Sequence, residues 1–591
     1  MTISSLLTQR LRAAVADLAP DTQPQVSAAS DSRFGDYQTN VAMVLAKALR
    51  GNPRQLAQQI IGKLDVADLC ETPEIAGAGF INLRLRPEAV AARFAELASD
   101  ERLGVPRPER VKTIVVDFSS PNVAKPMHVG HIRSTILGDA LARIAEFIGH
   151  RTVRDNHIGD WGKQFGMLLV GWKTILDQDA LARDPIAELE RVYKTINGAI
   201  QDEKAGAPGE TPMGRAVSEE LLKLQSGDAE NLGIWREMIR LSQAQFDSVY
   251  GQLGVRFDFT HGESFYNEWL AAAIASLRER DIATASEGAL CVFSDRSGKP
   301  EDDPFLIKDQ DGWRDNPAMV QKSDGAANYT TTDLATLEYR MKTWSPDEIV
   351  YVTDGRQQLH FRQLFAVFRR WHPELAGSVR LAHVWFGSIL GADGKPFKTR
   401  TGETIRLSDL LDEAEERALK LVSEKNPDLP EEERREIARI VGLGAVKYAD
   451  LLPNRQSDYV FSWDKMLSFQ GNTAPYLQYS YVRIRSIFRK LDEPFATPAR
   501  IELTEAAELG LAKKLFHFGD VLPQVLDDYR PNVLANYLFE LANTFHSFYE
   551  ACPVLKAEGA TRANRLALCE VTGRVLQRGL GLLGIEAPER M

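Results

Sequence analysis

A short apolar run, a polar loop and a long amphipathic segment, in that order, constrain this chain more than any other feature. The run TIVVDF at 113–118 is rich in β-branched residues and has the length of a buried strand. After the loop, apolar residues recur along 132–148 with the spacing of one helical face, and Gly149 stands where a helix is capped at its C-terminus. Similar strand and helix patterns recur at 151–166, 347–371 and 378–390. This alternation predicts a mainly parallel sheet whose ligands lie beyond the carboxyl ends of its strands.

Two further regions flank this α/β part, and one interrupts it. Residues 1–108 mix helical patterns with short strands such as GFINLRL and end in a proline-containing linker, which predicts a small N-terminal α+β domain. Residues 109–405 are expected to form the parallel-sheet domain, with an insertion of polar helices and turns at about 172–325. Residues 406–591 have a helical period almost throughout, which predicts an all-helical C-terminal domain.

The bulk composition excludes several classes of protein. With 591 residues, 44% hydrophobic and 26% charged, the chain is long enough for three or four packed units. No stretch approaches the roughly 18 apolar residues that a membrane span needs, and the N-terminus lacks the pattern of an export signal. The four cysteines are far apart and form no CxxC pair, so we expect neither a disulfide framework nor a cysteine zinc site. These features predict a soluble protein of the reducing cytoplasm, with no membrane partner.

The sequence HVGH at 128–131 lies where the loop enters the predicted helix. Free backbone amides and the positive end of a helix dipole make such a junction an anion site, and the imidazoles of His128 and His131 are able to donate hydrogen bonds to phosphate oxygens. Gly130 has no Cβ and would let a phosphate or a flat ring approach the backbone, while Lys125 adds a positive charge nearby. From the spacing alone, two other interpretations stay open. One is a chance HxxH in which a histidine caps the helix, and the other is half of a metal site, which lacks the glutamate of HExxH and a third ligand.

A second cationic segment, GKPFKTRTG, follows the predicted strand near residue 380. Lys395, Lys398 and Arg400 crowd a glycine-containing turn there, and such a loop is suited to closing over a triphosphate as pyrophosphate leaves. A solvated basic turn is the alternative. GADGKPF lacks the upstream glycine of a P-loop, and GLGLLG at 579–584 follows no strand and is interpreted as a helix terminus.

The order of these features, together with several longer sequence words, resembles the class I aminoacyl-tRNA synthetases and, within that class, the arginyl-tRNA synthetase family. HVGH is similar to the HIGH element of the class. The family words are DFSSPNVAKPMHVGHIRST, NHIGDWGKQFG, YTTTDLA, YVTDGRQQLHF, SFQGNTAPYLQY and the C-terminal ERM, and they are spread over nearly the whole chain. The resemblance implies a Rossmann-like catalytic domain, an N-terminal module that contacts the tRNA elbow and a C-terminal anticodon-binding domain.

The resemblance further implies an ATP-dependent ligase of L-arginine and tRNA(Arg), which works through arginyl-adenylate. Magnesium is expected to accompany ATP, and no tightly bound metal or organic cofactor is expected. The catalytic residues that the resemblance implies are Lys125, His128, His131, Lys398 and Arg400. The ATP-binding residues that it implies are His128, Gly130, His131, Lys395 and Lys398. The loop GKPFKTRTG departs from the KMSKS element of the class, because Arg400 and Thr401 stand where a second lysine is expected, and the resemblance implies that Lys125 is the substitute cation.

Selection of arginine requires recognition of a planar fork that is always charged, and carboxylates suit it because they accept two parallel hydrogen bonds. The arginine-binding residues implied by the family motifs are Asp117, Asn122, His128, Tyr329, Asp333 and Gln357. Lysine would miss the bidentate geometry, and neutral citrulline would lose a buried ion pair, a loss of about 2–5 kcal/mol. Asp117 ends a predicted strand, so capping of a turn is its alternative role.

The C-terminal part offers local cationic and aromatic groups, which a tRNA needs on a chain whose net charge is −11. Three tyrosines (476, 479 and 481) lie close in sequence to Arg483 and Arg485, a mixture suited to stacking on unpaired bases while contacting phosphates. The alternative is a helix whose tyrosines fill the core. The tRNA-binding residues implied by the resemblance are Phe80, Asn82, Tyr476, Tyr479, Arg483, Tyr549 and Met591. We expect a monomer whose first step, by resemblance, requires bound tRNA.

Two other functions are compatible with parts of the pattern. A noncatalytic tRNA-binding regulator could keep the synthetase fold, but the intact His128, His131 and Asp333 disfavour it. A nucleotidylyltransferase that acts on a small metabolite would share the fold class but would not need the long helical tail.

Overall fold

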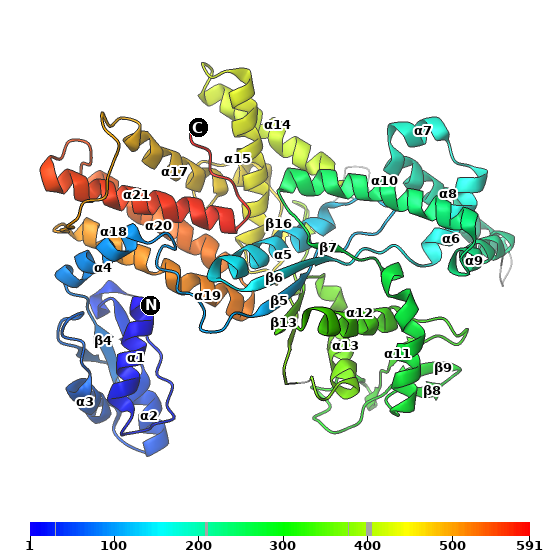
Figure 1. Cartoon of the computed structure of the whole chain (residues 1–591), viewed down its shortest axis with the longest axis horizontal. Helices are drawn as coiled ribbons and strands as arrows, with labels where there is room; N and C mark the ends of the chain where they lie inside the picture. The colour runs from blue at the N-terminus through cyan, green and yellow to red at the C-terminus, as the bar shows by residue number, and fades with distance from the viewer. Residues whose placement is uncertain (30, 207–210, 376, 398–404) are drawn as a thin grey trace. The chain divides into compact units, whose positions relative to one another are not determined.

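The computed structural model describes residues 1–29, 31–206, 211–375, 377–397 and 405–591. Lys398 and Arg400 of the cationic loop lie outside the described residues. The chain forms two compact units, which are residues 110–417 with 453–463, and residues 1–109 with 418–452 and 464–591 (Figure 1). Within the described ranges, no helix is long and apolar enough to cross a membrane.

A five-stranded parallel sheet forms the centre of the unit that begins at residue 110. Its order is β14-β13-β5-β6-β7, and each neighbouring pair is parallel. The strands are β5 (Thr113–Asp117), β6 (Arg151–Asn156), β7 (Phe259–Thr260), β13 (Glu348–Tyr351) and β14 (Arg380–His383). The chain builds outward from β5 to β7 on one side and then crosses to β13 and β14 on the other. In such sheets ligands bind where the order reverses, beyond the carboxyl ends of the two central strands. Here that point is the register pair Asp117 and Tyr351.

The helix after β5 confirms the strand, loop and helix predicted from the sequence. It is α5 (Val129–Ile148), and its C-cap residue Gly149 adopts a left-handed φ of 119° that favours glycine. The predicted apolar face is buried at Ile132, Ile136, Leu137, Leu141, Ile144 and Ile148. Strand β13 is buried at all four positions because a parallel sheet of this kind is covered on both faces.

The segment expected as an insertion, 172–325, supplies separate elements and one strand of the parallel sheet. Its helices are α7 (Gln178–Arg183), α8 (Pro185–Gly206), α9 (Pro212–Gln225), α10 (Ala229–Leu253) and α11 (Asn267–Glu279). Its antiparallel strands are β8 (Thr284–Ser286) and β9 (Ala289–Val292) with β12 (Ala318–Gln321), and the pair β10 (Leu306–Asp309) and β11 (Gly312–Asp315). Strand β7 lies in the same segment but pairs with β6, and its two residues are too few for a periodic signal.

The remaining elements of this unit surround the sheet or extend from it. They are α6 (Lys163–Thr174), η2 (Glu263–Tyr266), α12 (Tyr329–Trp344), η3 (Gly355–Gln357), α13 (Gln358–Trp371), β15 (Ile389–Leu390) and β16 (Tyr459–Val460). Helix α14 (Leu407–Lys425) and helix α16 (Trp463–Met466) each run from one unit into the other.

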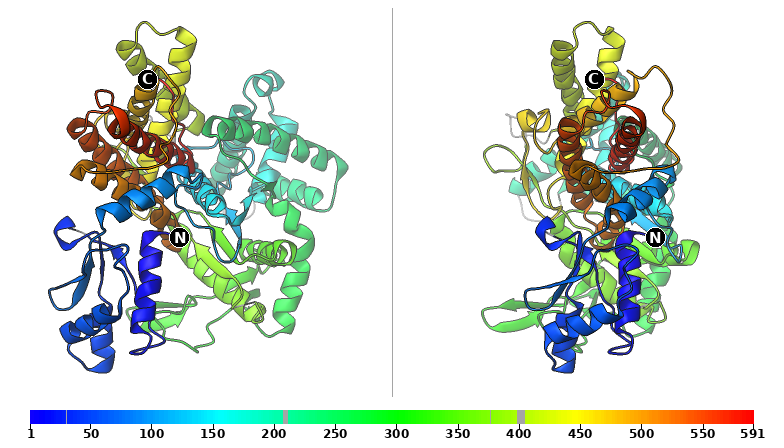
Figure 2. Two further views of the ribbon diagram at one scale, coloured as in Figure 1. Left: turned by 60° about the vertical axis from the view of Figure 1, so that its left-hand side comes forward. Right: turned by 90° about the vertical axis from the view of Figure 1, so that its left-hand side faces the viewer.

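The second unit combines a small antiparallel sheet with a bundle of long helices. The sheet has the order β1-β2-β4-β3 and is accompanied by three helices and the 3₁₀ turn η1 (Ser32–Phe34). These elements are β1 (Ser27–Ala28), β2 (Tyr37–Thr39), β3 (Glu74–Ala76), β4 (Phe80–Leu83), α1 (Ile3–Val15), α2 (Val41–Leu49) and α3 (Pro53–Lys63). The longer helices are α4 (Pro87–Ser99), α15 (Glu431–Leu451), α17 (Ala474–Phe488), α18 (Ala506–Phe516), α19 (Phe518–Asp528), α20 (Pro531–Ala551) and α21 (Gly559–Leu582) (Figure 2). The GLGLLG sequence lies at the C-terminal end of α21, which confirms its interpretation as a helix terminus.

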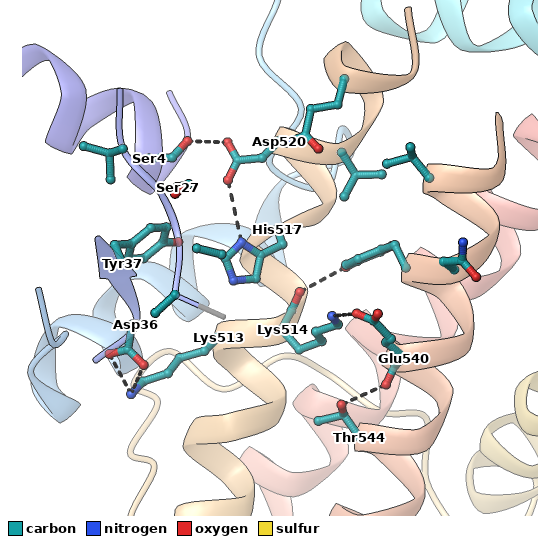
Figure 3. A pocket seen from close by; sticks show the side chains of 18 of the residues that line it. Ser4, Ser27, Asp36, Tyr37, Lys513, Lys514, His517, Asp520, Glu540 and Thr544 are labelled. Carbon is teal, nitrogen blue, oxygen red and sulfur yellow. Dashed lines mark hydrogen bonds and ion pairs between the residues drawn. The ribbon is translucent and has the colours of Figure 1, made fainter. Parts of the chain in front are cut away.

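Polar contacts join the N-terminal elements of this unit to α18 and α19 (Figure 3). The Ser4 hydroxyl donates to Asp520 at 2.6 Å, and the Lys513 ammonium lies 2.8 and 3.0 Å from the two carboxylate oxygens of Asp36. These contacts border an open polar cavity of about 860 Å³. Hydrogen bonds and ion pairs along this edge are therefore among the contacts that hold the two parts together.

Candidate active site

The loop between β5 and α5 follows a strained path that several hydrogen bonds support. Ser119, Ser120 and Ala124 all have left-handed φ values, of 73°, 49° and 60°, which non-glycine residues rarely adopt. The amide of Ser119 donates to the Ser134 hydroxyl at 2.8 Å, and the amide of Ala124 donates to the Ser242 hydroxyl at 2.9 Å. Buried side chains from α5 and α10 therefore impose the backbone path that leads to HVGH.

His128 and His131 form a capping box at the start of α5. The Gly130 amide donates to His128 Nδ1 at 3.0 Å, and the His128 amide donates to His131 Nδ1 at 3.1 Å. The two ring centroids are 4.0 Å apart. A Cβ on residue 130 would lie 2.8 Å from His128 Cε1, so Gly130 leaves room for this ring. His128 therefore caps the helix, and His131 completes the capping box.

The capping hydrogen bonds fix which nitrogen of each ring carries the proton. Because both Nδ1 atoms accept from backbone amides, the neutral rings carry hydrogen on Nε2. Burial lowers the pKa of His131 to about 3, with a smaller contribution from His128, so this ring is neutral at pH 7. The pKa of His128 is also lowered, by burial first and then by the positive charges of Arg356 and Lys125. The site thus presents two Nε2–H donors at the N-terminus of a helix, which is an arrangement suited to phosphate oxygens.

Two cationic side chains, Lys125 and Arg356, lie close enough to this cap for their charges to act on His128. Lys125 places its ammonium 4.8 Å from the ring centroid of Tyr193. Lys395 is exposed on the turn that follows β15. The backbone after the cationic loop returns to HVGH, because the Val129 amide donates to the Ile405 carbonyl at 3.0 Å and the Leu407 amide donates to the Met127 carbonyl at 2.9 Å. Among the described residues, no group of three His, Cys, Asp or Glu side chains is arranged to hold a metal ion.

Asp117, at the carboxyl end of β5, is buried and paired with side chains of the protein itself. Its Oδ2 lies 2.7 Å from Nη2 of Arg340, a fully buried guanidinium that also contacts Asp155 at 2.8 Å. Ser120 donates to Asp117 Oδ1 at 3.1 Å, as expected for a residue that caps a turn. The buried pair fixes the ends of β5 and β6 against α12, and removal of one partner would leave an uncompensated charge. Sequence reasoning did not identify Arg340, which lies 223 positions away in the chain.

The other residues assigned to arginine lie on the neighbouring elements. Asp333, one turn into α12, contacts His360 Nε2 at 2.6 Å, and the ring of Tyr329 packs edge-on against His360 with centroids 4.9 Å apart. Tyr329 is 61% exposed and is therefore free to contact a ligand. Gln357, in η3, and Asn122, in the β5–α5 loop, are both exposed.

An acidic group that the sequence did not reveal completes this side of the site. Glu263, in η2 directly after β7, has its pKa raised to about 8, first by burial and then by the negative charges of Asp333 and Asp160. The pKa of Asp160 is also raised, mainly by burial. A partly buried carboxyl near two others is an environment that favours an incoming guanidinium. The only signal in the sequence was a polar run, THGES, after a strand too short to recognise.

The residues assigned to the anticodon lie on one face formed by α17 and α20. Tyr476 donates to Asn543 Oδ1 at 2.7 Å, and Arg483 lies 5.2 Å from the exposed ring of Tyr479 and 3.0 Å from His546 Nδ1. Tyr549 is half-buried on α20, one turn beyond His546. Tyr481, by contrast, is buried and donates to Glu589 at 2.7 Å, so it anchors the C-terminal segment that ends at Met591. In the N-terminal sheet Phe80 is half-buried, whereas Asn82 is only 6% exposed.

The sheet order, the HVGH helix cap and the helical C-terminal part define a class I aminoacyl-tRNA synthetase. The family model described as tRNA synthetases class I (R), catalytic domain, matches residues 94–463. The DALR anticodon binding domain matches 477–591, and the arginyl tRNA synthetase N terminal domain matches 2–85.

Curated relatives and solved structures agree over the full length. Arginine–tRNA ligase of Laribacter hongkongensis is 47% identical over 597 residues, and that of Cellvibrio japonicus is 44% identical over 598, each with 100% of both chains covered. The structure of Thermus thermophilus arginyl-tRNA synthetase has a TM-score of 0.83 at 26% identity, with 100% of both chains covered. The Plasmodium falciparum enzyme has a TM-score of 0.81 at 27% identity, with 100% of this chain and 99% of the other covered. The chain belongs to the arginyl-tRNA synthetase family.

Proposed function

We propose that this chain ligates L-arginine to tRNA(Arg) at the expense of ATP. The arginine carboxylate attacks the α-phosphate of ATP to give arginyl-adenylate and pyrophosphate, and a terminal ribose hydroxyl of the tRNA then accepts the arginyl group and releases AMP. The observation that carries the proposal is the meeting, at one end of a parallel sheet, of a phosphate-type helix cap and a cluster of carboxyls.

His128 and His131 are proposed to bind the ATP phosphates through their Nε2–H groups. Neutral donors on a rigid helix cap stabilise charge that develops on the phosphoryl oxygens without moving during the reaction. Lys125 supplies a point charge beside them, and Gly130, Lys395, Lys398 and Arg400 complete the proposed set. ATP is proposed to enter as its magnesium complex, with no other tightly bound cofactor.

Arginine is proposed to place its guanidinium among the carboxyls of Glu263 and Asp333. Charge-assisted bidentate hydrogen bonds to a carboxylate select this fork over lysine. Tyr329, Gln357, Asn122, His128 and Asp117 are proposed to line the rest of the pocket. Asp117 is paired with Arg340, so we propose that it holds the wall of the pocket in place in addition to contacting arginine.

The tRNA is proposed to contact two regions of the second unit. The α17 and α20 face, with Tyr476, Tyr479, Arg483 and Tyr549, would bind the anticodon together with Met591. The N-terminal sheet would contact the tRNA elbow through Phe80, while the buried Asn82 would support the strand. The proposed domains are residues 1–108 for the tRNA elbow, 109–405 for catalysis and 406–591 for the anticodon.

The four cysteines are all buried and free, which supports a reducing compartment, and we propose a cytoplasmic monomer. Light scattering across a tenfold range of concentration checks the monomer.

The experiment that tests the function is ATP–pyrophosphate exchange with each of the twenty amino acids, with and without total tRNA. Exchange with arginine alone, and only in the presence of tRNA, is the expected result. Lys125→Ala should lower exchange far more than it lowers arginine binding. Exchange with another amino acid would contradict the proposed pocket, and the absence of exchange under all conditions would favour a noncatalytic tRNA-binding protein.

A further inference from the structure

Helix α8 contacts both flanks of the HVGH cap, although it belongs to the segment 172–325 that the sequence suggested is separate. On one flank, the Tyr193 ring faces the Lys125 ammonium at 4.8 Å. On the other, Glu190 contacts the Arg406 guanidinium at 3.5 Å, and Asp184, just before α8, contacts it at 3.3 Å. Arg406 is itself paired with His128 through an antiparallel backbone bridge.

Glu190 and Tyr193 are three residues apart, so they are neighbours on one face of α8. That face therefore offers a carboxylate to the cation that follows the loop and an aromatic ring to the cation that precedes HVGH. The two contacts differ in chemistry. A carboxylate neutralises its partner, whereas a ring attracts a cation through its quadrupole and leaves the three N–H donors of an ammonium available.

Lys125 has no carboxylate partner within the described ranges of the chain. Its backbone path is set by the left-handed φ of Ala124, 60°, and by the hydrogen bond from the Ala124 amide to Ser242. The side chain is long and flexible, and its ammonium lies against the ring of Tyr193. The positive charge reaches the cap, since it contributes to lowering the pKa of His128.

We propose that Tyr193 is a positioning residue for Lys125, and that it holds the ammonium at the edge of the phosphate site until ATP binds. This inference rests on the proposed role of Lys125 in adenylate formation. Tyr193 does not touch the reacting atoms. It restricts the lysine side chain to conformations near the phosphate site. It also keeps the ammonium from pairing with acidic groups elsewhere on α8, such as Glu190.

The test compares Tyr193→Leu, Tyr193→Met and Tyr193→Phe in tRNA-dependent ATP–pyrophosphate exchange. Loss of a partly buried cation–π contact is expected to lower kcat/KM for ATP about tenfold in the Leu and Met variants. KM for arginine should stay within twofold, and Tyr193→Phe, which keeps the ring, should stay near the wild type. Tyr193 also borders the apolar cluster of Met167, Val170 and Ile196, so thermal unfolding is recorded for each variant, and Met preserves the apolar volume.

Thr195→Ala, an exposed position on the same helix, is the matched control and should leave exchange unchanged. Each Tyr193 variant is also made in a Lys125→Ala background, where it should have no further effect on kcat/KM. An equal loss in that background, or a Phe variant as impaired as Leu, would overturn the inference and indicate a purely structural tyrosine. Exchange that stays near the wild-type rate in Lys125→Ala would overturn the role of Lys125 and this inference together. A loss in Lys125→Ala with none in Tyr193→Leu or Tyr193→Met would overturn this inference alone.

Discussion

At the scale of single residues, Glu263 makes arginine binding depend on pH. Its pKa of about 8 means that the free site is mostly protonated at pH 7, while a guanidinium favours the carboxylate form. Arginine binding should therefore release up to one proton, and affinity should rise by up to about tenfold per pH unit from pH 6.5 towards 8. Isothermal titration calorimetry in buffers of different ionisation enthalpy measures this release. Glu263→Gln should weaken arginine binding by about 2–5 kcal/mol and make the arginine affinity less dependent on pH. An affinity independent of pH in the wild type would place the guanidinium elsewhere.

His131 should lower the stability of the protein in mild acid. Its folded pKa, about 3, is below the unfolded value of about 6.5, so between these limits the unfolded chain binds one more proton and stability falls as pH falls. One such site contributes up to about 1.4 kcal/mol per pH unit. His131→Asn should therefore reduce the drop in Tm between pH 6.5 and 5, as measured by calorimetry. His546→Asn removes an exposed histidine and serves as the control, and an unchanged drop in both variants would contradict the argument.

Local sequence indicated the residues that we propose for phosphate binding but not the acidic group that we propose for arginine. His128, Gly130, His131 and Lys125 occupy seven consecutive positions, so a short motif and the helix that follows it indicate one chemistry. Glu263 acquires its raised pKa only from burial near residues that are distant in the chain. The partner that engages Asp117 is equally distant. Such properties arise from tertiary packing, which one sequence without an alignment does not reveal.

At the scale of elements, α5 depends on its close approach to the strand that precedes it. A Cβ on Gly138 would lie 2.2 Å from the ring carbon Cγ of Phe118, the residue directly after β5. Gly138→Ala should thus cost about 1–3 kcal/mol of stability through overpacking and should disturb the loop that leads to HVGH. Thermal unfolding and pyrophosphate exchange measure the two effects.

Gly233→Ala is the matched control for that change, because it lies on α10 with no atom within 4 Å of the added Cβ. It should raise stability by up to about 1 kcal/mol through helix propensity. Equal effects of the two substitutions would show that the α5 contact is looser than the distance indicates.

Element prediction succeeded where a periodic pattern was long and failed where pairing was not local. The 20 residues of α5 and its glycine cap were evident from spacing alone. Strand β7 has two residues and joins the sheet after four intervening helices of the 172–325 segment, so nothing in its neighbourhood marks it as a strand. The position of α8 beside HVGH was not predicted for the same reason. A segment that interrupts the α/β pattern in the sequence can still pack against the site in the folded protein.

At the scale of the whole molecule, a chain of net charge −11 must bind a polyanion through a few local cations. We propose that Arg483 is one of them on the α17 and α20 face, and that Tyr479 beside it offers a stacking surface instead of charge. Substitutions of these two residues should therefore change the salt dependence of tRNA binding differently. Arg483→Gln should weaken tRNA binding and reduce the slope of log K against log salt by about 0.7, the value for one contact to a single strand. Tyr479→Ala should weaken binding by about 1–3 kcal/mol with the slope unchanged. Filter binding of tRNA(Arg) between 50 and 200 mM salt measures both. If Tyr479→Ala lowered the slope and Arg483→Gln did not, this face would not contact tRNA in the manner proposed, and the cations that offset the net charge would have to lie elsewhere.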